Sequence, residues 1–259
     1  MNHCAFVGTK HTDAKNNKFT LAAAGERRII MKVTWLTQAG LIFDNGRIRV
    51  LIDPYLSDSL GDADPTKHRR IAVPEEFSHP VADVLILTNT EPDRLDDASL
   101  TRVLSGDRRM TILASEGAYN KIRHFGGGHN YVLLSPHSVW SEGGITFYSV
   151  KAEHSDRTAI GVILDDGDKT YYVSGDTLYN YDVLDDCLDL VENGVDYAFL
   201  PINGYGNNMN AKDAADFAYE LGADKAIPIH YGLFDDVDPD DFDFEDAMVI
   251  TPFVETELD

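Results

Sequence analysis

The chain has 259 residues, of which 43% are hydrophobic, so it is long enough to bury one large core. Its formal net charge of −22 repels phosphate backbones and anionic membrane surfaces, which excludes nucleic acid and membranes from the expected partners. The sequence has no run of about 18 apolar residues and no signal-peptide core, so we expect a cytoplasmic protein. Cys4 and Cys187 are too few for a disulfide framework and are expected to be free thiols.

The fold is expected to begin at Met31. Residues 1–30 are polar, slightly basic and weakly patterned, so we expect a loosely ordered leader or an alternative start there. From Met31 the segment "MKVTWL" shows a clean apolar alternation, which is typical of a strand. Residues 31–259 are therefore expected to form one domain, which includes an acidic C-terminal segment.

A hairpin is the next expected feature. The strand-like residues 41–43 lead through the turn "DNG" into the alternating residues 47–53. Residues 55–70 contain so many turn formers that we expect a long loop without a regular element. A buried strand over Val84–Leu87 then leads into the polar stretch "TNTEPDRLDD".

The rest of the chain alternates strands with helices. Asp96 or Asp97 can cap a helix over "ASLTRVL", and Asn210 and Gly222 can begin and end a helix over "AKDAADFAYEL". From Asp235 onward there are 11 acidic residues and no basic ones, which favours a solvated tail. Further strands are expected at residues 110–114, 131–134, 145–150, 159–164, 170–175, 197–202 and 225–229. This order predicts an α/β (α+β) protein in which stacked sheets are covered by helices.

Four polar motifs follow apolar strands: "TNTEPDR", "EHSD", "SGDT" and "PIHYG". Loops at strand ends are where a rigid scaffold presents functional groups. The order of these motifs resembles the metallo-β-lactamase superfamily. The segments "LIDPYL", "SGDT" and "NGYGNNMNAKDAADFAYELG" look like the branch that includes L-ascorbate-6-phosphate lactonase. The resemblance extends from Met31 to about Phe234 and implies an αββα four-layer sandwich.

In that family, the strand-end loops supply the ligands of a one- or two-metal hydrolase centre, and the first motif is Thr-His-x-His-x-Asp-His. This chain keeps Thr88 and Asp93, but Arg94 replaces the last histidine of a degenerate motif. The resemblance implies the following metal ligands: Asn89, Glu91, Asp93, His154, Asp176 and His230.

The changed ligands predict one divalent metal ion at most. The Glu91, His154 and Asp176 side chains, with the amide oxygen of Asn89, form an oxygen-rich set that suits manganese, magnesium or iron as well as zinc. Arg94 places a positive charge where the second ion belongs, at a cost on the order of 8 kcal/mol for an effective dielectric of about 20. Its guanidinium is expected to pair with a nearby aspartate or to bind a substrate phosphate or carboxylate.

These residues predict a metal-dependent hydrolase. A single metal ion lowers the pKa of a bound water, and Asp93 is expected to orient that water and accept its proton, with Arg94 as the second catalytic residue. The resemblance implies a small anionic ester or lactone as substrate, such as a phosphorylated sugar lactone. It also places Asn203, Asn207 and Asn208 of "NGYGNN" beside the substrate.

A second interpretation fits the same substitutions. The loss of three imidazoles is also what a catalytically silent member of the superfamily would show, in which the fold serves as a ligand-binding or regulatory module without metal. In both interpretations the expected partner is a small anionic metabolite. Whether the chain forms a homo-oligomer stays open.

Overall fold

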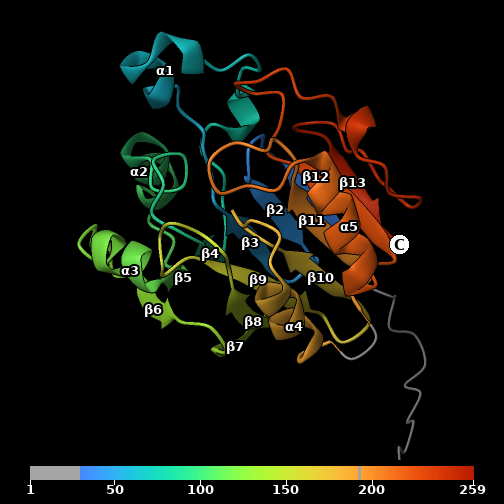
Figure 1. The fold of residues 1–259 in the computed structure, drawn as a ribbon. Coiled ribbons are helices and arrows are strands. Elements are labelled where there is room, and N and C mark those ends of the chain that lie inside the picture. Colours follow the sequence, from blue (N-terminus) through green and yellow to red (C-terminus); the bar gives the residue numbers. More distant parts are fainter. Residues whose placement is uncertain (1–29, 192–193) are drawn as a thin grey trace, which may run out of the picture.

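The computed structural model describes residues 30–191 and 194–259. Apart from Ile30, the expected leader over residues 1–30 lies outside the described residues. The described residues form two β-sheets, and helices cover the outer face of each (Figure 1). This arrangement confirms the expected αββα sandwich.

The first sheet has seven strands in the order β13-β1-β2-β3-β4-β5-β6. Strands β1 to β3 are antiparallel, whereas β3 to β6 are parallel, so the carboxyl ends of β3 and β4 lie at the same edge. The strand bounds are β1 Met31–Trp35, β2 Leu41–Asp44, β3 Arg49–Ile52, β4 Val84–Leu87, β5 Thr111–Ser115, β6 Asn130–Leu134 and β13 Glu255–Leu258.

The second sheet has six strands in the order β12-β11-β10-β9-β8-β7. Strands β7 to β10 are antiparallel, and β10 to β12 are parallel. The bounds are β7 Val139–Glu142, β8 Ile145–Lys151, β9 Ile160–Asp165, β10 Thr170–Val173, β11 Tyr197–Pro201 and β12 Lys225–Ile229.

Strand β4 shows how the layers are built. Its residues alternate between two cores: Val84 and Ile86 belong to the core shared with the second sheet, whereas Leu85 and Leu87 pack with the helices outside the first sheet. The helix bounds are α1 Ser59–Ala63, α2 Asp97–Leu104, α3 Glu116–Ile122, α4 Tyr181–Leu188 and α5 Ala211–Leu221, with 3₁₀ turns η1 Pro65–Lys67, η2 Glu75–Phe77 and η3 Pro239–Asp241.

The helix ends follow the capping signals in the sequence. The Asp96 side chain accepts a hydrogen bond from the backbone N–H of Ser99, and Asn210 caps α5 in the same way. Gly222 ends α5 with φ of 71°, the left-handed conformation that glycine adopts most readily. The expected caps at Asp96 and Asn210 and the expected stop at Gly222 are confirmed.

Two predictions about irregular segments were wrong. Residues 55–70 contain α1 and η1. Tyr55 Oη accepts a hydrogen bond from the backbone of Leu60, and the Ser59 hydroxyl donates to Asp96, and these contacts outweigh the many turn formers. The segment after Asp235 is not a solvated tail, since β13 pairs with β1 and three apolar side chains anchor the segment: Phe242, Ile250 and Leu258. Patterns for α3, α4 and β7 were not recognised in the sequence.

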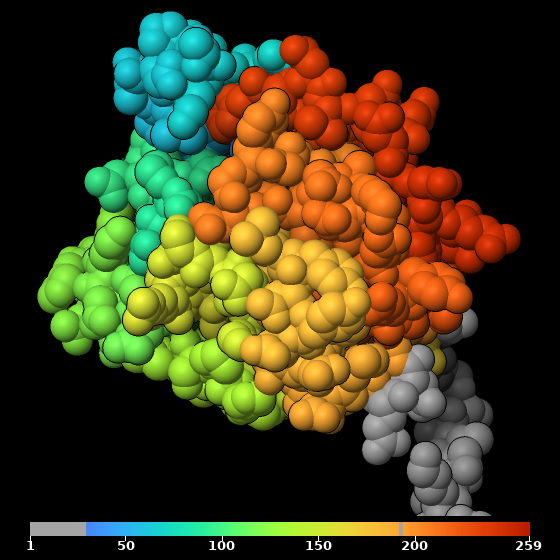
Figure 2. Space-filling view, viewed as in Figure 1, coloured from blue at the N-terminus to red at the C-terminus, as the bar shows by residue number. Residues whose placement is uncertain are grey.

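The region around α1 lies against the start of the C-terminal segment, as Figure 2 shows for the cyan and red atoms. Arg70 makes this contact through an ion pair with Asp236 and a hydrogen bond to the carbonyl of Asp235. Cys187 is a buried free thiol. Across the described residues, every helix is too short or too polar to cross a membrane.

Candidate functional site

The strand-end loops converge on one cavity of about 480 Å³. It lies at the edge where the carboxyl ends of strands from both sheets meet, which is where parallel strands present functional loops. Most of the candidate site residues line it: Glu91, Asp93, His154, Asp176, Asn203, Asn207, Asn208 and His230. The other two, Asn89 and Arg94, are fully buried.

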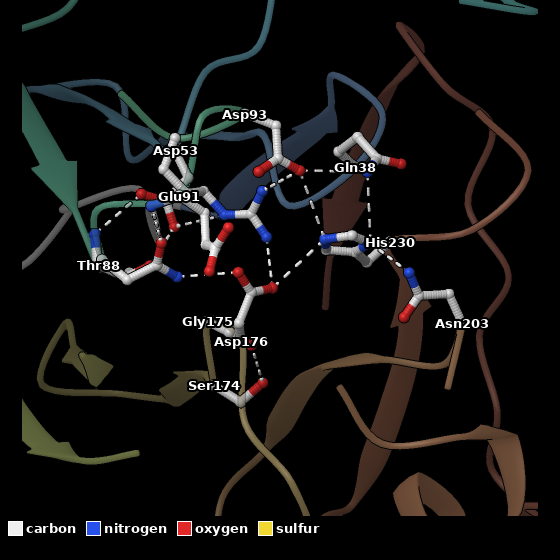
Figure 3. Close-up of polar contacts among 12 residues, drawn as sticks. Gln38, Asp53, Thr88, Glu91, Asp93, Ser174, Gly175, Asp176, Asn203 and His230 are labelled. Carbon is white, nitrogen blue, oxygen red and sulfur yellow. Dashed lines mark hydrogen bonds and ion pairs between the residues drawn. The ribbon is translucent and has the colours of Figure 1, made fainter. Parts of the chain in front are cut away.

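A buried arginine lies among three carboxylates. Arg94 Nη1 is 2.6 Å from Asp93 Oδ2, Nη2 pairs with Asp176, and Nε is 3.6 Å from Asp53 Oδ2 (Figure 3). Burial opposes the charge of Arg94, but Asp176, Asp93 and Asp53 outweigh it and raise the pKa of the guanidinium. We call these four residues the arginine cluster.

Asp53 is the most deeply enclosed carboxylate of the arginine cluster. It follows β3, and Thr88 at the end of the neighbouring parallel strand β4 donates to it from the backbone (2.9 Å) and from the hydroxyl. Complete burial raises the pKa of Asp53 to about 6, although Arg94 and Thr88 act in the opposite direction.

Asp176 is held between Arg94 and two polar neighbours. Its Oδ2 accepts a hydrogen bond from Asn89 Nδ2 at 2.8 Å, and its Oδ1 lies 3.3 Å from His230 Nε2. Burial opposes ionisation, but the charge of Arg94 and the contact with His230 lower the pKa of Asp176. The glycine at position 175 lets the backbone before Asp176 pack closely against its neighbours. A Cβ there would lie 2.9 Å from a backbone oxygen and 3.0 Å from the Thr88 hydroxyl.

In both site histidines, neighbouring donors determine which ring nitrogen carries the proton. The amide nitrogen of Asn203 lies 3.0 Å from His230 Nδ1, and the backbone N–H of Asp156 donates to His154 Nδ1 at 2.9 Å. Each Nδ1 therefore accepts, and a neutral ring carries its proton on Nε2. The Nε2 atom of His154 lies 3.9 Å from Glu91 Oε1.

The backbone around the cavity is strained. The described part of the chain has six non-glycine residues with positive φ, and four of them surround this site: Thr37 (73°), Gln38 (47°), Asp53 (42°) and His230 (61°). Such conformations cost of order 1–3 kcal/mol each and persist where the surrounding structure enforces them, which happens most often at functional sites.

The fold and this cavity agree with a comparison to known protein families. Residues 48–231, well over half of the chain, match a family described as the Beta-lactamase superfamily domain. The chain belongs to the beta-lactamase superfamily. The superfamily and its metallo-β-lactamase fold are thereby confirmed as predicted from the motif order.

Relatives in this superfamily are named metal-dependent hydrolases. A UPF0173 metal-dependent hydrolase of Exiguobacterium sp. is 29% identical over 242 residues, which cover 84% of this chain and 93% of that protein. One from Pelotomaculum thermopropionicum is 28% identical and covers 88% of this chain and 96% of its own length.

Solved structures support the fold. Igni18, a metallo hydrolase of Ignicoccus hospitalis, superposes with a TM-score of 0.71 at 16% identity and covers 89% of this chain and 99% of that one. An isothiocyanate hydrolase from Delia radicum gut bacteria gives a TM-score of 0.68 at 21% identity and covers 87% of this chain and 98% of that one.

The superfamily's metal ion does not fit the residues as this structure arranges them. A ligand histidine must offer a lone pair, but His154 and His230 present protonated Nε2 atoms to carboxylates. The amide oxygen of Asn89 accepts the backbone N–H of Glu91 at 2.9 Å. No group of three or more His, Cys, Asp or Glu side chains within residues 30–191 and 194–259 is arranged to hold a metal ion.

The three candidate asparagines have different surroundings. Asn203 contacts His230, and Asn207 exchanges two hydrogen bonds with Ser155 at 3.0 and 3.1 Å. Asn208 is the one of the three whose side-chain oxygen is buried without a hydrogen-bond partner among the described residues. Asn203 and Asn207 therefore fix neighbouring groups, whereas Asn208 leaves an acceptor available.

Sequence reasoning missed two residues of the site. Asp53 ends a strand in "LIDPYL", and a carboxylate at the end of an apolar strand is the same signal that identified Asp93 and Asp176. Gln38 in "LTQAG" lies in the turn between β1 and β2, and its amide nitrogen is 3.3 Å from Asp93 Oδ2. No signal in the sequence distinguishes Gln38 from an ordinary turn residue.

Proposed function

We propose that this protein is a ligand-binding member of the superfamily that works without a metal ion. The observation that carries the proposal is the arginine cluster. A fixed guanidinium charge lies among Asp53, Asp93 and Asp176 in the place of a divalent cation, so the carboxylates that a metal would need already have a cationic partner. A ligand would occupy the 480 Å³ cavity beside them, a volume that suits a small molecule.

The hydrogen-bond network also supports this proposal. Arg94 is the charge at its centre, Asn89 and His230 direct donors at Asp176, and Thr88 directs two donors at Asp53. A network that holds its carboxylates with an internal cation and several donors is rigid and does not depend on a further cation. We call the arginine cluster the floor of the cavity and the other lining residues, such as Glu91 and Asn208, its wall. Binding would therefore use the wall above a preorganised floor.

Metal content and thermal melting test the proposal together. Protein purified without chelators should contain no stoichiometric manganese, iron, zinc or magnesium by elemental analysis. Its melting temperature should be the same with EDTA as with added zinc or manganese, because a ligand that does not bind cannot shift the equilibrium. A bound ion at unit stoichiometry, or a fall in melting temperature with EDTA, would overturn the proposal.

Hydrolysis with one metal ion is the second candidate function, and the names of the relatives favour it. Glu91 and His154 face each other across 3.9 Å and share the cavity with Asp176. This candidate needs His154 to release the backbone N–H of Asp156 so that its proton can move to Nδ1. Its substrate would be the small anionic ester or lactone implied by the lactonase resemblance. Hydrolysis of a phosphorylated lactone that EDTA abolishes would favour it over the first proposal.

A further inference from the structure

Two buried oxygen atoms in the cavity wall have no hydrogen-bond partner within the described part of the chain. They are Gln38 Oε1 and Asn208 Oδ1, which belong to two residues that line the cavity and are 2% and 8% exposed. Buried acceptors are almost always paired in folded proteins, because an unpaired one has lost its water and gained nothing in return. These two oxygens therefore indicate that a donor from outside the chain belongs in the cavity.

The orientation of the Gln38 amide is fixed by its neighbours. Its Nε2 lies 3.3 Å from Asp93 Oδ2 and 3.5 Å from His230 Nδ1, which are both acceptors (Figure 3). Only the nitrogen end of an amide can satisfy acceptors, so the oxygen end is the one that stays unpaired. The missing partner of Gln38 is thus a hydrogen-bond donor.

The charge of the cavity points to the same kind of ligand. Its ionised lining comprises four carboxylates and a single lysine: Glu91, Asp93, Asp176, Asp235 and Lys67. The nearest buried cation, Arg94, is fully enclosed and paired within the arginine cluster, so it cannot reach a ligand. The Glu91 side chain is 42% exposed, whereas those of Asp93 and Asp176 are 14% and 5% exposed, so Glu91 is more open to a ligand than either. An anion would meet repulsion here, whereas a cation would be attracted.

We propose that the cavity binds a small protonated amine. Its charge would lie at Glu91, and its N–H groups would supply the donors that Gln38 Oε1 and Asn208 Oδ1 lack. Tyr205 and Phe234 also line the cavity and offer aromatic surface for the carbon chain or for a cation–π contact. This inference rests on the proposed metal-free site, because a metal ion would compete for the same carboxylates, and it takes the place of the anionic metabolite expected from the sequence.

Three probes of equal length test the charge of the ligand: putrescine, 1,4-butanediol and succinate. Each is titrated by calorimetry into the full chain after dialysis against EDTA. Putrescine should bind with saturation, the neutral diol should bind at least about tenfold more weakly because it lacks the charge-assisted hydrogen bonds, and succinate should not bind. Binding of succinate in preference to putrescine, or no binding of putrescine, would overturn the inference.

Matched variants separate the cavity from the general negative charge of the protein. Glu91→Gln and Asn208→Ala should each weaken putrescine binding about tenfold, since each removes one contact to a charged donor. Glu116→Gln removes the same charge at the start of α3, outside the cavity lining, and should leave the affinity unchanged. Equal weakening by Glu91→Gln and Glu116→Gln would mean diffuse attraction and would overturn the inference.

The metal content of the same samples distinguishes the two proposals. A stoichiometric metal ion before dialysis would contradict the metal-free site, whatever the titrations show. Metal-free protein that binds succinate but not putrescine would leave the metal-free site intact and refute the ligand class.

Discussion

The charged groups in the floor of the cavity are paired and largely buried, whereas the wall carries an exposed carboxylate. In the floor, the arginine cluster pairs three carboxylates with one guanidinium, and Arg94 and Asp53 are both fully buried. In the wall, Glu91 is 42% exposed, and Asn208 keeps an acceptor oxygen without a partner among the described residues. The floor is closed to new ligands, whereas the wall is open to them.

This difference suggests how a fold shared with metal-dependent hydrolases can hold its loops together without a metal ion. The guanidinium supplies a positive charge and several donors in a fixed plane, so it can bind carboxylates from three strand ends at once. The strand-end loops then keep their positions, and the cavity keeps its shape. If the floor is structural and the wall binds, substitutions in the floor should affect stability more than those in the wall.

The largest effect is expected for Arg94→Met. It leaves Asp53, Asp93 and Asp176 buried without their counter-charge, and the loss of one partner of a buried ion pair costs about 3–5 kcal/mol of unfolding free energy. Urea denaturation measures this cost. Arg108→Met is the control, because its ion pair with Asp83 lies at the surface and should contribute at most about 1 kcal/mol. Similar losses in the two variants would contradict a structural role for the arginine cluster.

The next effect concerns the pH dependence of stability. The pKa of Asp53 is raised to about 6 by burial, so the folded state holds this proton more tightly than the unfolded state does. The contribution of Asp53 to stability is therefore complete below about pH 4. As the pH rises through 6, this contribution falls by about 3 kcal/mol of unfolding free energy. Asp53→Asn should remove this dependence.

Unfolding free energies of the wild type and Asp53→Asn, measured from pH 4 to pH 7, test this prediction. As the pH rises from 4 to 7, the unfolding free energy of the wild type should fall relative to that of the variant. Curves that stay parallel would show that Asp53 ionises as readily in the folded state as in the unfolded state.

A smaller effect is expected where two loops of the wall are joined. Asp156 accepts hydrogen bonds from the backbone and hydroxyl groups of both Thr90 and Thr158, which ties the Glu91 loop to the His154 loop. Asp156→Ala should cost about 2 kcal/mol, and Asp156→Asn should cost less because it keeps one acceptor oxygen. Thermal melting ranks the two variants. Equal loss in both would mean that charge, rather than hydrogen bonding, holds the loops together.

The smallest effect is expected in the wall. Asn207→Ala removes two hydrogen bonds to Ser155 that lie at the surface, so it should cost less than about 1 kcal/mol. Faster hydrogen exchange at the Ser155 amide would be the local sign of this loss. A loss as large as that of Arg94→Met would mean that wall and floor are not distinct.

From the strand-end motifs we expected Glu91, His154 and Asp176 to lie close together. In the structure all three line one cavity. The pairing of Arg94 with a nearby aspartate was also expected, because a guanidinium beside carboxylates has few alternatives. Asp53 was missed, since its contact with Arg94 depends on the parallel pairing of β3 with β4, which the pattern of a single strand does not specify.

The remaining errors have physical causes of the same kind. The acidic composition after Asp235 indicated solvation, but the few apolar side chains in that segment decide its position, because one buried aromatic outweighs several exposed carboxylates. The tautomer of the neutral His154 ring depends on a backbone N–H two residues away, which spacing in the sequence cannot reveal. The fold was therefore easier to predict than the state of the site.

Zinc titration of Arg94→His tests most directly whether the guanidinium takes the place of a metal ion. The substituted imidazole would join the carboxylates of Asp93 and Asp176, and three protein ligands with a water molecule suit zinc. The wild type should take up no zinc, and the variant should take up about one equivalent, measured by elemental analysis after gel filtration. Equal zinc uptake by the two proteins would contradict the account.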